Sequence, residues 1–377
     1  MRPTVRATPP GFHARTTPSY LERLHLDPLL CVLLLGLALI GLFVLYSASS
    51  ASGGTVERQA IRLLVAFVIL LVFAQIPPER YYQWAPWLFG AGVLLLVAVL
   101  AVGQVSQGAR RWLDIGPISI QPSELMKLAM PMMVARYLSL RESPPSWIAI
   151  GITLLLIAIP SGLTAKQPDL GTAILIASAG LTALFLAGLS LWLLVVGLIG
   201  AASLMPIVWH FLHQYQRDRV LTLLNPERDP LGKGYHIIQS KIAIGSGGAM
   251  GKGWMHGTQS HLDFLPAHTT DFIFAVIGEE FGFIGCALVI VLFLAILARG
   301  LWISTHTSTP FSRLLVGSLS LTFFISAFIN MGMVIGILPV VGVPLPFISY
   351  GGSSMLTMAA SFGIIMSVHT HRKLWSR

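Results

Sequence analysis

The chain has 377 residues, of which 55% are hydrophobic and only 10% are charged, and its formal net charge at pH 7 is +9. A soluble domain of this size cannot bury so much apolar surface, so the composition indicates a protein solvated by lipid. Nucleic-acid binding is also disfavoured, because no basic helix or patch falls outside the pattern expected of membrane loops.

Apolar runs long enough to cross a membrane, which takes about 20 mostly apolar residues, recur along the chain. They are continuous and do not alternate, which predicts helices rather than a barrel. Residues 1–27 form a tail rich in Pro, Thr and Arg that we expect to be disordered, and 28–377 form one polytopic membrane domain. We therefore predict an all-α membrane protein with about ten transmembrane helices, near 28–46, 61–76, 85–103, 124–140, 147–162, 170–187, 190–210, 271–298, 313–337 and 352–369.

Basic residues indicate the orientation. With about ten spans both termini lie on one side, and the tails and short loops of that side hold most of the Lys and Arg. The positive-inside rule then predicts cytoplasmic termini. The long loop between the seventh and eighth helices, 211–270, is expected to be extracytoplasmic.

An aspartate ends this long loop. Asp271 precedes an apolar run that begins at Phe272, which places its carboxylate at the outer membrane interface. Its position alone leaves two interpretations open: a helix N-cap stabilised by the helix dipole, or a general base within hydrogen-bond reach of a hydroxyl. The two roles pull its pKa in opposite directions, because the dipole favours the ionised carboxylate whereas burial raises its pKa.

A second set of candidates lies near the predicted starts of the fourth and sixth helices: Arg111, Trp112, Glu124, Lys127, Lys166 and Asp169. Glu124 and Lys127 are three residues apart, so they share a helix face and can pair. A charged pair inside an apolar span is expensive and commonly functional. Ion pairs that only fix helix packing are an equally good interpretation.

Glycine, lysine and histidine are frequent in the long loop. The glycine runs at 245–248 and 251–253 offer backbone amides for a pyrophosphate, with Lys241 and Lys252 adding charge. The pattern is neither a dinucleotide-binding nor a Walker motif, so a flexible loop is the default interpretation. Six histidines suggest zinc, but they lack tight ligand spacing and solvated side chains are the simpler explanation: His210, His213, His236, His256, His261 and His268.

Three stretches resemble the SEDS family of integral-membrane glycosyltransferases. One runs from Pro266 to Asp271 and continues to Glu279 and Glu280, although the family has Glu after the proline and His-Thr before the aspartate. This chain has Ala267 and Thr269-Thr270 there, with its histidine at His268. The block Tyr235–Gly248 is similar to the elongation-type members. The C-terminal signature comprises Asn330, Gly336, Pro339, Gly342 and Ser349–Ser354, where Pro344 and Pro346 suggest either a rigid re-entrant loop or a plain turn.

The resemblance implies a peptidoglycan glycosyltransferase of cell elongation in the bacterial cytoplasmic (inner) membrane. Asp271 would deprotonate the GlcNAc 4-hydroxyl of the acceptor as it attacks the MurNAc anomeric carbon of lipid II, with inversion and release of undecaprenyl pyrophosphate. Substrate-binding candidates are the residues of a central cavity and the loop lysines: Arg111, Trp112, Glu124, Lys127, Lys166, Asp169, Lys241 and Lys252.

The resemblance also implies partners and cofactors. The expected partners are lipid II, the nascent glycan strand, membrane lipid and a class B penicillin-binding protein, the transpeptidase that cross-links the strands. A divalent cation, Mg²⁺ or Mn²⁺, is a candidate to assist the cationic side chains at the leaving pyrophosphate, its ligands are unknown, and no organic cofactor is expected.

Two other classes of function stay open. A lipid II flippase needs cationic residues deep in the bundle and an alternating-access cavity, whereas the informative charges of this chain cluster at one interface. A non-catalytic scaffold for the transpeptidase does not explain an aspartate and several lysines beside the membrane.

Overall fold

The computed structural model describes residues 24–49, 52–106, 109–115, 118–211, 214–228, 232–261, 264–265 and 267–371. Long helices lie at all ten predicted positions: α2 (Pro28–Ala48), α3 (Gly53–Gln75), α4 (Pro78–Val102), α5 (Pro122–Ser139), α6 (Trp147–Lys166), α7 (Leu170–Leu186), α8 (Leu191–Phe211), α12 (Ile273–Thr305), α13 (Pro310–Ile335) and α14 (Ser353–Thr370). The prediction of a helical membrane protein is confirmed. Five of these helices, α2, α4, α6, α12 and α13, are by themselves long and apolar enough to cross a membrane, and the number of spans stays a prediction.

Two regions contain elements that the sequence analysis missed. Between α4 and α5, the short strands β1 (Gln104–Ser106), β2 (Ala109–Ile115) and β3 (Ile118–Ile120) form an antiparallel sheet in chain order. The long loop contains the helices α9 (Gln214–Leu224), α10 (Lys233–Gly247) and α11 (Thr258–His261) and the 3-10 turn η1 (Pro226–Arg228). The sheet and these loop helices lie at one end of the helical bundle.

Two helices begin at a side-chain cap followed by proline. Asp27 caps α2 and accepts a hydrogen bond from Leu30 N, and Pro28 follows it. Thr309 caps α13 in the same way, directly before Pro310. Proline suits the first helical position because its missing N–H would have no partner there, and the capping oxygen satisfies an exposed backbone donor.

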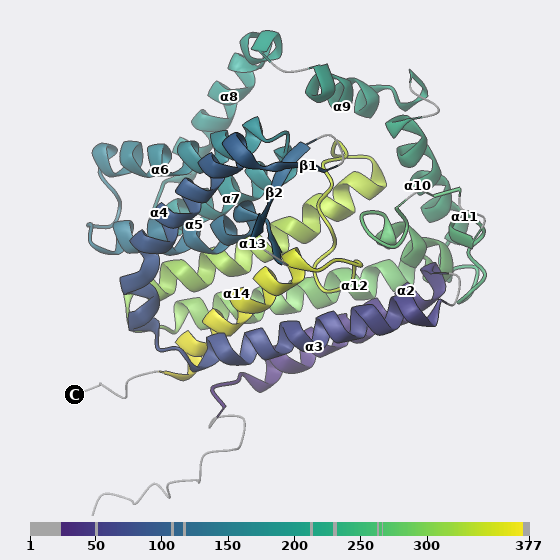
Figure 1. Cartoon of the computed structure of the whole chain (residues 1–377), viewed down its shortest axis with the longest axis horizontal. Coiled ribbons are helices and arrows are strands. Elements are labelled where there is room, and N and C mark those ends of the chain that lie inside the picture. Colours follow the sequence, from purple (N-terminus) through teal and green to yellow (C-terminus); the bar gives the residue numbers. More distant parts are fainter. Residues whose placement is uncertain are drawn as a thin grey trace, which may run out of the picture.

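Helix α13 forms the centre of the bundle (Figure 1). Of the 18 most apolar consecutive residues of α13, 78% are buried inside the protein. The corresponding share is 28–39% for α2, α4, α6 and α12. The helices α5, α7 and α12 pack around it, α3 packs along α14, and α2 packs on α12. The outer helices expose large apolar side chains, such as Val32, Leu64 and Leu94, which is the pattern of a surface that faces lipid.

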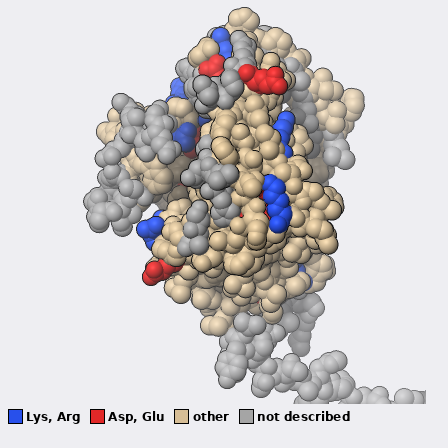
Figure 2. Space-filling view, turned by 90° about the vertical axis from the view of Figure 1, so that its right-hand side faces the viewer, with Lys and Arg blue, Asp and Glu red and all other residues tan. Residues whose placement is uncertain are grey.

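The end of the molecule that carries α10 and α11 is mostly uncharged (Figure 2). Lys and Arg form separate patches on the described part of this face rather than one continuous basic surface. This distribution gives no support to nucleic-acid binding, which requires a basic stripe or face.

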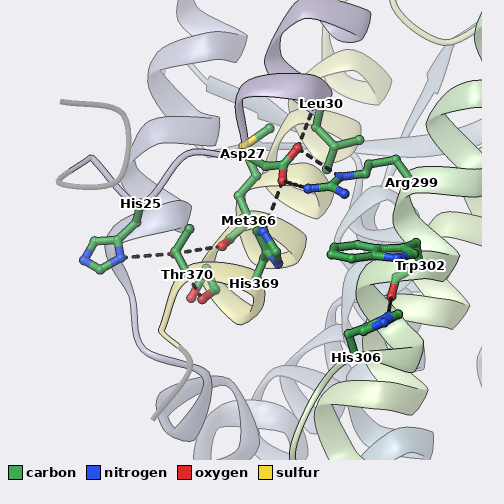
Figure 3. A network of polar contacts seen from close by, with 10 residues as sticks. His25, Asp27, Leu30, Arg299, Trp302, His306, Met366, His369 and Thr370 are labelled. Carbon is green, nitrogen blue, oxygen red and sulfur yellow. Dashed lines mark hydrogen bonds and ion pairs between the residues drawn. The ribbon is translucent and has the colours of Figure 1, made fainter. Parts of the chain in front are cut away.

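At the opposite end, a buried carboxylate joins the first helix to two later ones (Figure 3). Asp27 is fully buried, and its two oxygens accept hydrogen bonds from Arg299 of α12, at 3.3 Å from Nε and 2.6 Å from Nη2. His369 Nε2 of α14 lies 3.2 Å from Oδ2. The Arg299 guanidinium also lies 4.2 Å above the ring of Trp302. Asp27 therefore fixes the start of α2 against α12 and α14.

We expect Asp27→Ala to lower the free energy of unfolding by about 2 kcal/mol, because it removes a helix cap and leaves Arg299 without its carboxylate. The value lies below the range for fully buried pairs, since the Arg299 side chain is 21% exposed. Thermal unfolding of the purified protein measures the loss. Unchanged stability would show that the fold does not depend on this network.

The same network predicts a pH dependence. Burial alone would raise the pKa of Asp27, but the hydrogen bonds from Arg299 and Leu30 and the charge of Arg299 outweigh it and hold this pKa below its ordinary value of 3.8. The stabilisation is therefore present above about pH 4 and is lost as the pH falls through the lower pKa of the folded state. Asp27→Ala should lack this part of the acid dependence.

Candidate functional site

The carbonyl oxygens of three consecutive residues, ending at Asp271, accept hydrogen bonds from the C-terminal part of the chain. The backbone N–H of Tyr350 donates to Thr269 O at 2.9 Å. The Ser349 hydroxyl donates to Thr270 O at 2.6 Å. The segment that closes the long loop is therefore fixed before it enters the membrane helix α12.

The third carbonyl is held from the central helix α13. The Asn330 side-chain amide donates to Asp271 O at 2.8 Å and to Val343 O at 2.7 Å. The backbone at Gly342 is left-handed, with φ +73°, and a Cβ there would lie 3.6 Å from Asp271 Oδ2. The Asp271 carboxylate thus lies against the main chain of the C-terminal signature.

Asp271 lies one residue before the cap position of α12. The helix begins at Ile273, Phe272 occupies the N-cap position, and no side chain caps it. The structure therefore does not support the N-cap interpretation. Burial raises the pKa of Asp271 above its ordinary value of 3.8, which makes its carboxylate a stronger base than a solvated aspartate.

A second cluster forms where the small sheet meets the start of α7. Arg111 on β2 donates from Nη2 to Pro168 O at 2.6 Å, and its Nε lies 3.9 Å from Asp169 Oδ2. Gln121 Nε2 donates to the same carboxylate oxygen at 3.1 Å, while Oδ1 accepts from Thr172 N and caps α7. The sheet therefore places the Arg111 guanidinium beside the start of α7.

The Glu124–Lys127 pair predicted from the sequence is present. Lys127 Nζ lies 2.7 Å from Glu124 Oε2 and 3.4 Å from Ser354 Oγ, and the Lys127 residue is only 4% exposed. The pair thus joins α5 to the first turn of α14. Of the other candidates in this region, Trp112 is half-buried on β2 and Lys166 is exposed at the end of α6.

The segment 336–354 connects these groups. Its Ser349 and Tyr350 hold the loop before Asp271, and its Ser354 contacts Lys127. Its residues Val341 and Val343 pack with Leu175 of α7, the helix that Asp169 caps. The segment is irregular between α13 and α14, and its residues 345–349 are buried, which favours the re-entrant interpretation over a plain turn. Irregular backbone at membrane depth requires this kind of burial in protein.

The two candidate lysines of the long loop, Lys241 and Lys252, have different surroundings. Lys252 Nζ lies 2.6 Å from Glu279 Oε1, an oxygen that also accepts from Thr258 N and Gln259 N. Because Glu279 is fully buried, this carboxylate folds the loop onto α12. Lys241 is exposed on α10.

The glycines of the loop allow close packing. Residues 245–247 form the last turn of α10, so the flexible-loop interpretation is wrong for them. Gly251, with φ +80°, lies so close to α12 that a Cβ there would be 2.1 Å from Glu280 O. No larger residue fits at this contact, which explains the glycine without a phosphate ligand.

A cavity of about 480 Å³ opens beside the loop that precedes Asp271. Its lining includes Arg58, His268, Thr269 and Tyr350, and the Arg62 guanidinium lies 4.5 Å from the Tyr350 ring centroid. Neither arginine belongs to a motif that the sequence indicates. A cavity of about 500 Å³ lies at the opposite end of the bundle, away from the candidate residues, so size does not identify the site.

The part of the chain described by the structure brings no three His, Cys, Asp or Glu side chains together in a way that could hold a metal ion. His213 lies outside the described residues. His268 Nδ1 lies 2.7 Å from Leu265 O, and His236 stacks on Phe272 with ring centroids 5.7 Å apart. These contacts favour structural roles for both histidines over zinc binding.

Comparison with known proteins gives matches over nearly the whole chain. The profile of the cell cycle protein family FtsW/RodA/SpoVE matches residues 27–374. The chain is 52% identical to the peptidoglycan glycosyltransferase MrdB of Escherichia coli K12, over 95% of this chain and 97% of that protein. It is 36% identical to the probable peptidoglycan glycosyltransferase FtsW of Trichlorobacter lovleyi, with coverages of 92% and 94%.

Two solved structures have the same fold. A chain of a peptidoglycan synthase complex that coordinates polymerization and crosslinking superposes with a TM-score of 0.80 at 34% identity, covering 92% of this chain and 98% of that chain. The rod shape determining protein RodA of Thermus thermophilus superposes with a TM-score of 0.69 at 28% identity, with coverages of 92% and 97%.

We expect Glu124 and Lys127 to be energetically coupled. Lys127→Ala leaves a carboxylate without its counter-ion in a mostly buried setting and should lower thermal stability, activity or both. Glu124→Gln combined with Lys127→Met should lose less stability than either single change. Thermal unfolding of the three variants measures the coupling, and additive losses would show that the two residues do not interact.

Proposed function

This chain belongs to the FtsW/RodA/SpoVE family of cell cycle proteins, and from this premise we propose that it polymerises lipid II with Asp271 as the general base. The family match and the 52% identity to a peptidoglycan glycosyltransferase confirm the resemblance to the SEDS family. The protein is a peptidoglycan glycosyltransferase of the RodA type, an integral membrane enzyme. The observation that carries the role of Asp271 is that its half-buried carboxylate lies against the C-terminal signature and does not cap α12.

Asp271 acts on the acceptor. Its carboxylate takes the proton of the GlcNAc 4-hydroxyl while that oxygen attacks the anomeric carbon of the donor MurNAc. The bond to the pyrophosphate breaks, undecaprenyl pyrophosphate leaves, and the α-linked donor gives a β-linked product. A raised pKa suits this role, since a general base works best when its pKa approaches the operating pH.

Cationic side chains stabilise the leaving pyrophosphate. Arg111 is the best placed of the candidates, because its side chain is 32% exposed and is oriented by Asp169 and Pro168. Lys127 adds charge from a buried position, and Lys166 and Lys241 are exposed. Lys252 is engaged by Glu279 and supports the site by folding the loop.

A divalent cation would enter together with the substrate. Mg²⁺ is commonly held by one or two carboxylates plus substrate phosphates, and the described residues supply no complete set of ligands. Mg²⁺ or Mn²⁺ would then take most of its ligands from the pyrophosphate, since the described residues bring no three His, Cys, Asp or Glu side chains together.

The partner is a transpeptidase of the class B penicillin-binding proteins. The support comes from the solved structure of a peptidoglycan synthase complex in which polymerization and crosslinking are coordinated. The flippase and scaffold alternatives have weaker support, because neither requires an aspartate whose main chain is fixed by hydrogen bonds to three consecutive carbonyls.

Replacing the Asp271 carboxylate by an amide tests the base. Asp271→Asn keeps the shape of the side chain but cannot accept a proton, so we expect a loss of at least about a hundredfold in polymerisation rate with normal folding. A residue with only a capping role would lose at most about 1 kcal/mol of stability and stay active. The measurement is glycan-strand synthesis from labelled lipid II, with thermal stability and partner binding checked on the same preparation.

Asp271→Glu is the matched control. It keeps the charge but moves it by one methylene, so it should fold and be badly impaired, because a base must lie within about 3 Å of the acceptor oxygen. In the wild type the rate should fall on acidification with a midpoint above pH 3.8, the ordinary pKa of aspartate. Normal polymerisation by Asp271→Asn would rule out the proposed base.

Orientation is tested by labelling. We propose that both termini are cytoplasmic and that the loop before Asp271 faces outward. In a background without Cys31 and Cys286, Ser246→Cys on α10 should react with an impermeant thiol reagent on intact spheroplasts, and Ser143→Cys should not. Both positions are exposed, so accessibility does not bias the comparison. The reverse pattern would place the site in the cytosol.

A further inference from the structure

We propose that Asn330 and Ser349 are positioning residues of the polymerisation reaction, which fix the main chain at Asp271 so that its carboxylate meets the acceptor hydroxyl. Neither side chain needs to touch the substrate for this role. The inference rests on the proposed function of Asp271 and assigns the residues that make it effective.

The hydrogen bonding of Asn330 points to a purpose beyond stability. The side chain is fully buried in the central helix, and both of its N–H groups are used, one on Asp271 O and one on Val343 O. Its Oδ1 atom has no hydrogen-bond partner among the described residues. An unsatisfied buried acceptor is unfavourable, so a residue present for packing alone would be apolar. The two donors explain the amide.

Ser349 links the loop before Asp271 to the turn in which it lies itself. Its hydroxyl accepts from Leu345 N at 2.7 Å and donates to Thr270 O at 2.6 Å. Its own carbonyl accepts from the buried Gln59 of α3 at 3.1 Å. Since α3 packs along α14, the hydrogen bond from Gln59 fixes Ser349 to this helix pair, and Ser349 in turn fixes the residue before Asp271.

Asn330 and Ser349 thus hold two adjacent carbonyls from two directions, the first from α13 and the second from the segment before α14. A side chain whose backbone is held on both sides has little freedom to shift. Misplacement of a reacting group by about 1 Å can cost about a hundredfold in rate. Loss of either contact should therefore lower kcat while leaving the binding of lipid II by the other residues intact.

The experiment compares Ser349→Ala and Asn330→Met with wild type, each as the full chain in complex with its transpeptidase partner. Polymerisation is followed as a function of lipid II concentration and pH. We expect kcat to fall by about tenfold or more, with KM changed less than about twofold. The acid limb of the pH–rate profile, where the rate falls as the carboxylate is protonated, should also move to lower pH. A displaced carboxylate is less buried, so its pKa falls towards 3.8.

Two controls separate positioning from a merely structural role. Ser349→Thr keeps the hydroxyl donor and should therefore retain most of the kcat that Ser349→Ala loses. Ser320→Ala removes another buried hydroxyl, which bonds within α13 to Val316 O, and should keep the wild-type kcat and acid limb. Partial unfolding lowers the active fraction but neither moves the acid limb nor is reversed by threonine.

The proposal is overturned if a folded Ser349→Ala and a folded Asn330→Met both keep the wild-type kcat and pH profile. It is also overturned if both lose activity with an unshifted acid limb. An inactive Asp271→Asn beside fully active Ser349→Ala and Asn330→Met rejects only the positioning role. An active Asp271→Asn rejects the general base itself, so the two failures are distinguishable.

Discussion

The hydrogen bonds to the carbonyls of Thr269, Thr270 and Asp271 are the constraint on which the site depends. Backbone carbonyls near a membrane find little water, so each requires a partner from the protein. A long polar loop ends here and an apolar helix begins, and the C-terminal signature supplies the donors. Helix α13 and the segment between α13 and α14 therefore fix the start of α12, and the two motifs function as one structure.

Several buried charged side chains in the protein likewise have partners of opposite charge. Asp27 pairs with Arg299, Lys127 with Glu124, and Lys252 with Glu279. Each group links parts of the chain that are far apart in sequence. Asp27 contacts α12 and α14, Lys127 also contacts Ser354 of α14, and Glu279 binds the long loop to α12. Buried pairs of this kind add little net stability but are costly to break. They select one arrangement of apolar helices, which otherwise pack in many ways.

The sequence predicted the long helices because hydropathy is a local signal, and it located Asp271 because the aspartate ends an apolar run. Strands of three to seven residues such as β1 and β2 carry too little alternation to be recognised. The helices α9 and α10 are much less apolar than the membrane helices, so hydropathy does not distinguish them from a loop. The contacts Arg62–Tyr350 and Gln59–Ser349 join residues far apart in the chain, and the local pattern around Arg62 contains no sign of its partner. Only the Glu124–Lys127 pair could be predicted, since its partners are one helical turn apart.

The way in which Asp271 is held suits a base. Hydrogen bonds donated to a carboxylate favour its ionised form and lower its pKa, which weakens it as a base. The three donors of the C-terminal part of the chain reach main-chain carbonyls instead. The backbone is therefore fixed while burial still raises the pKa of the side chain. Positioning through the main chain thus gives the enzyme a carboxylate that is both well placed and basic, whereas positioning through the carboxylate oxygens would trade one property for the other.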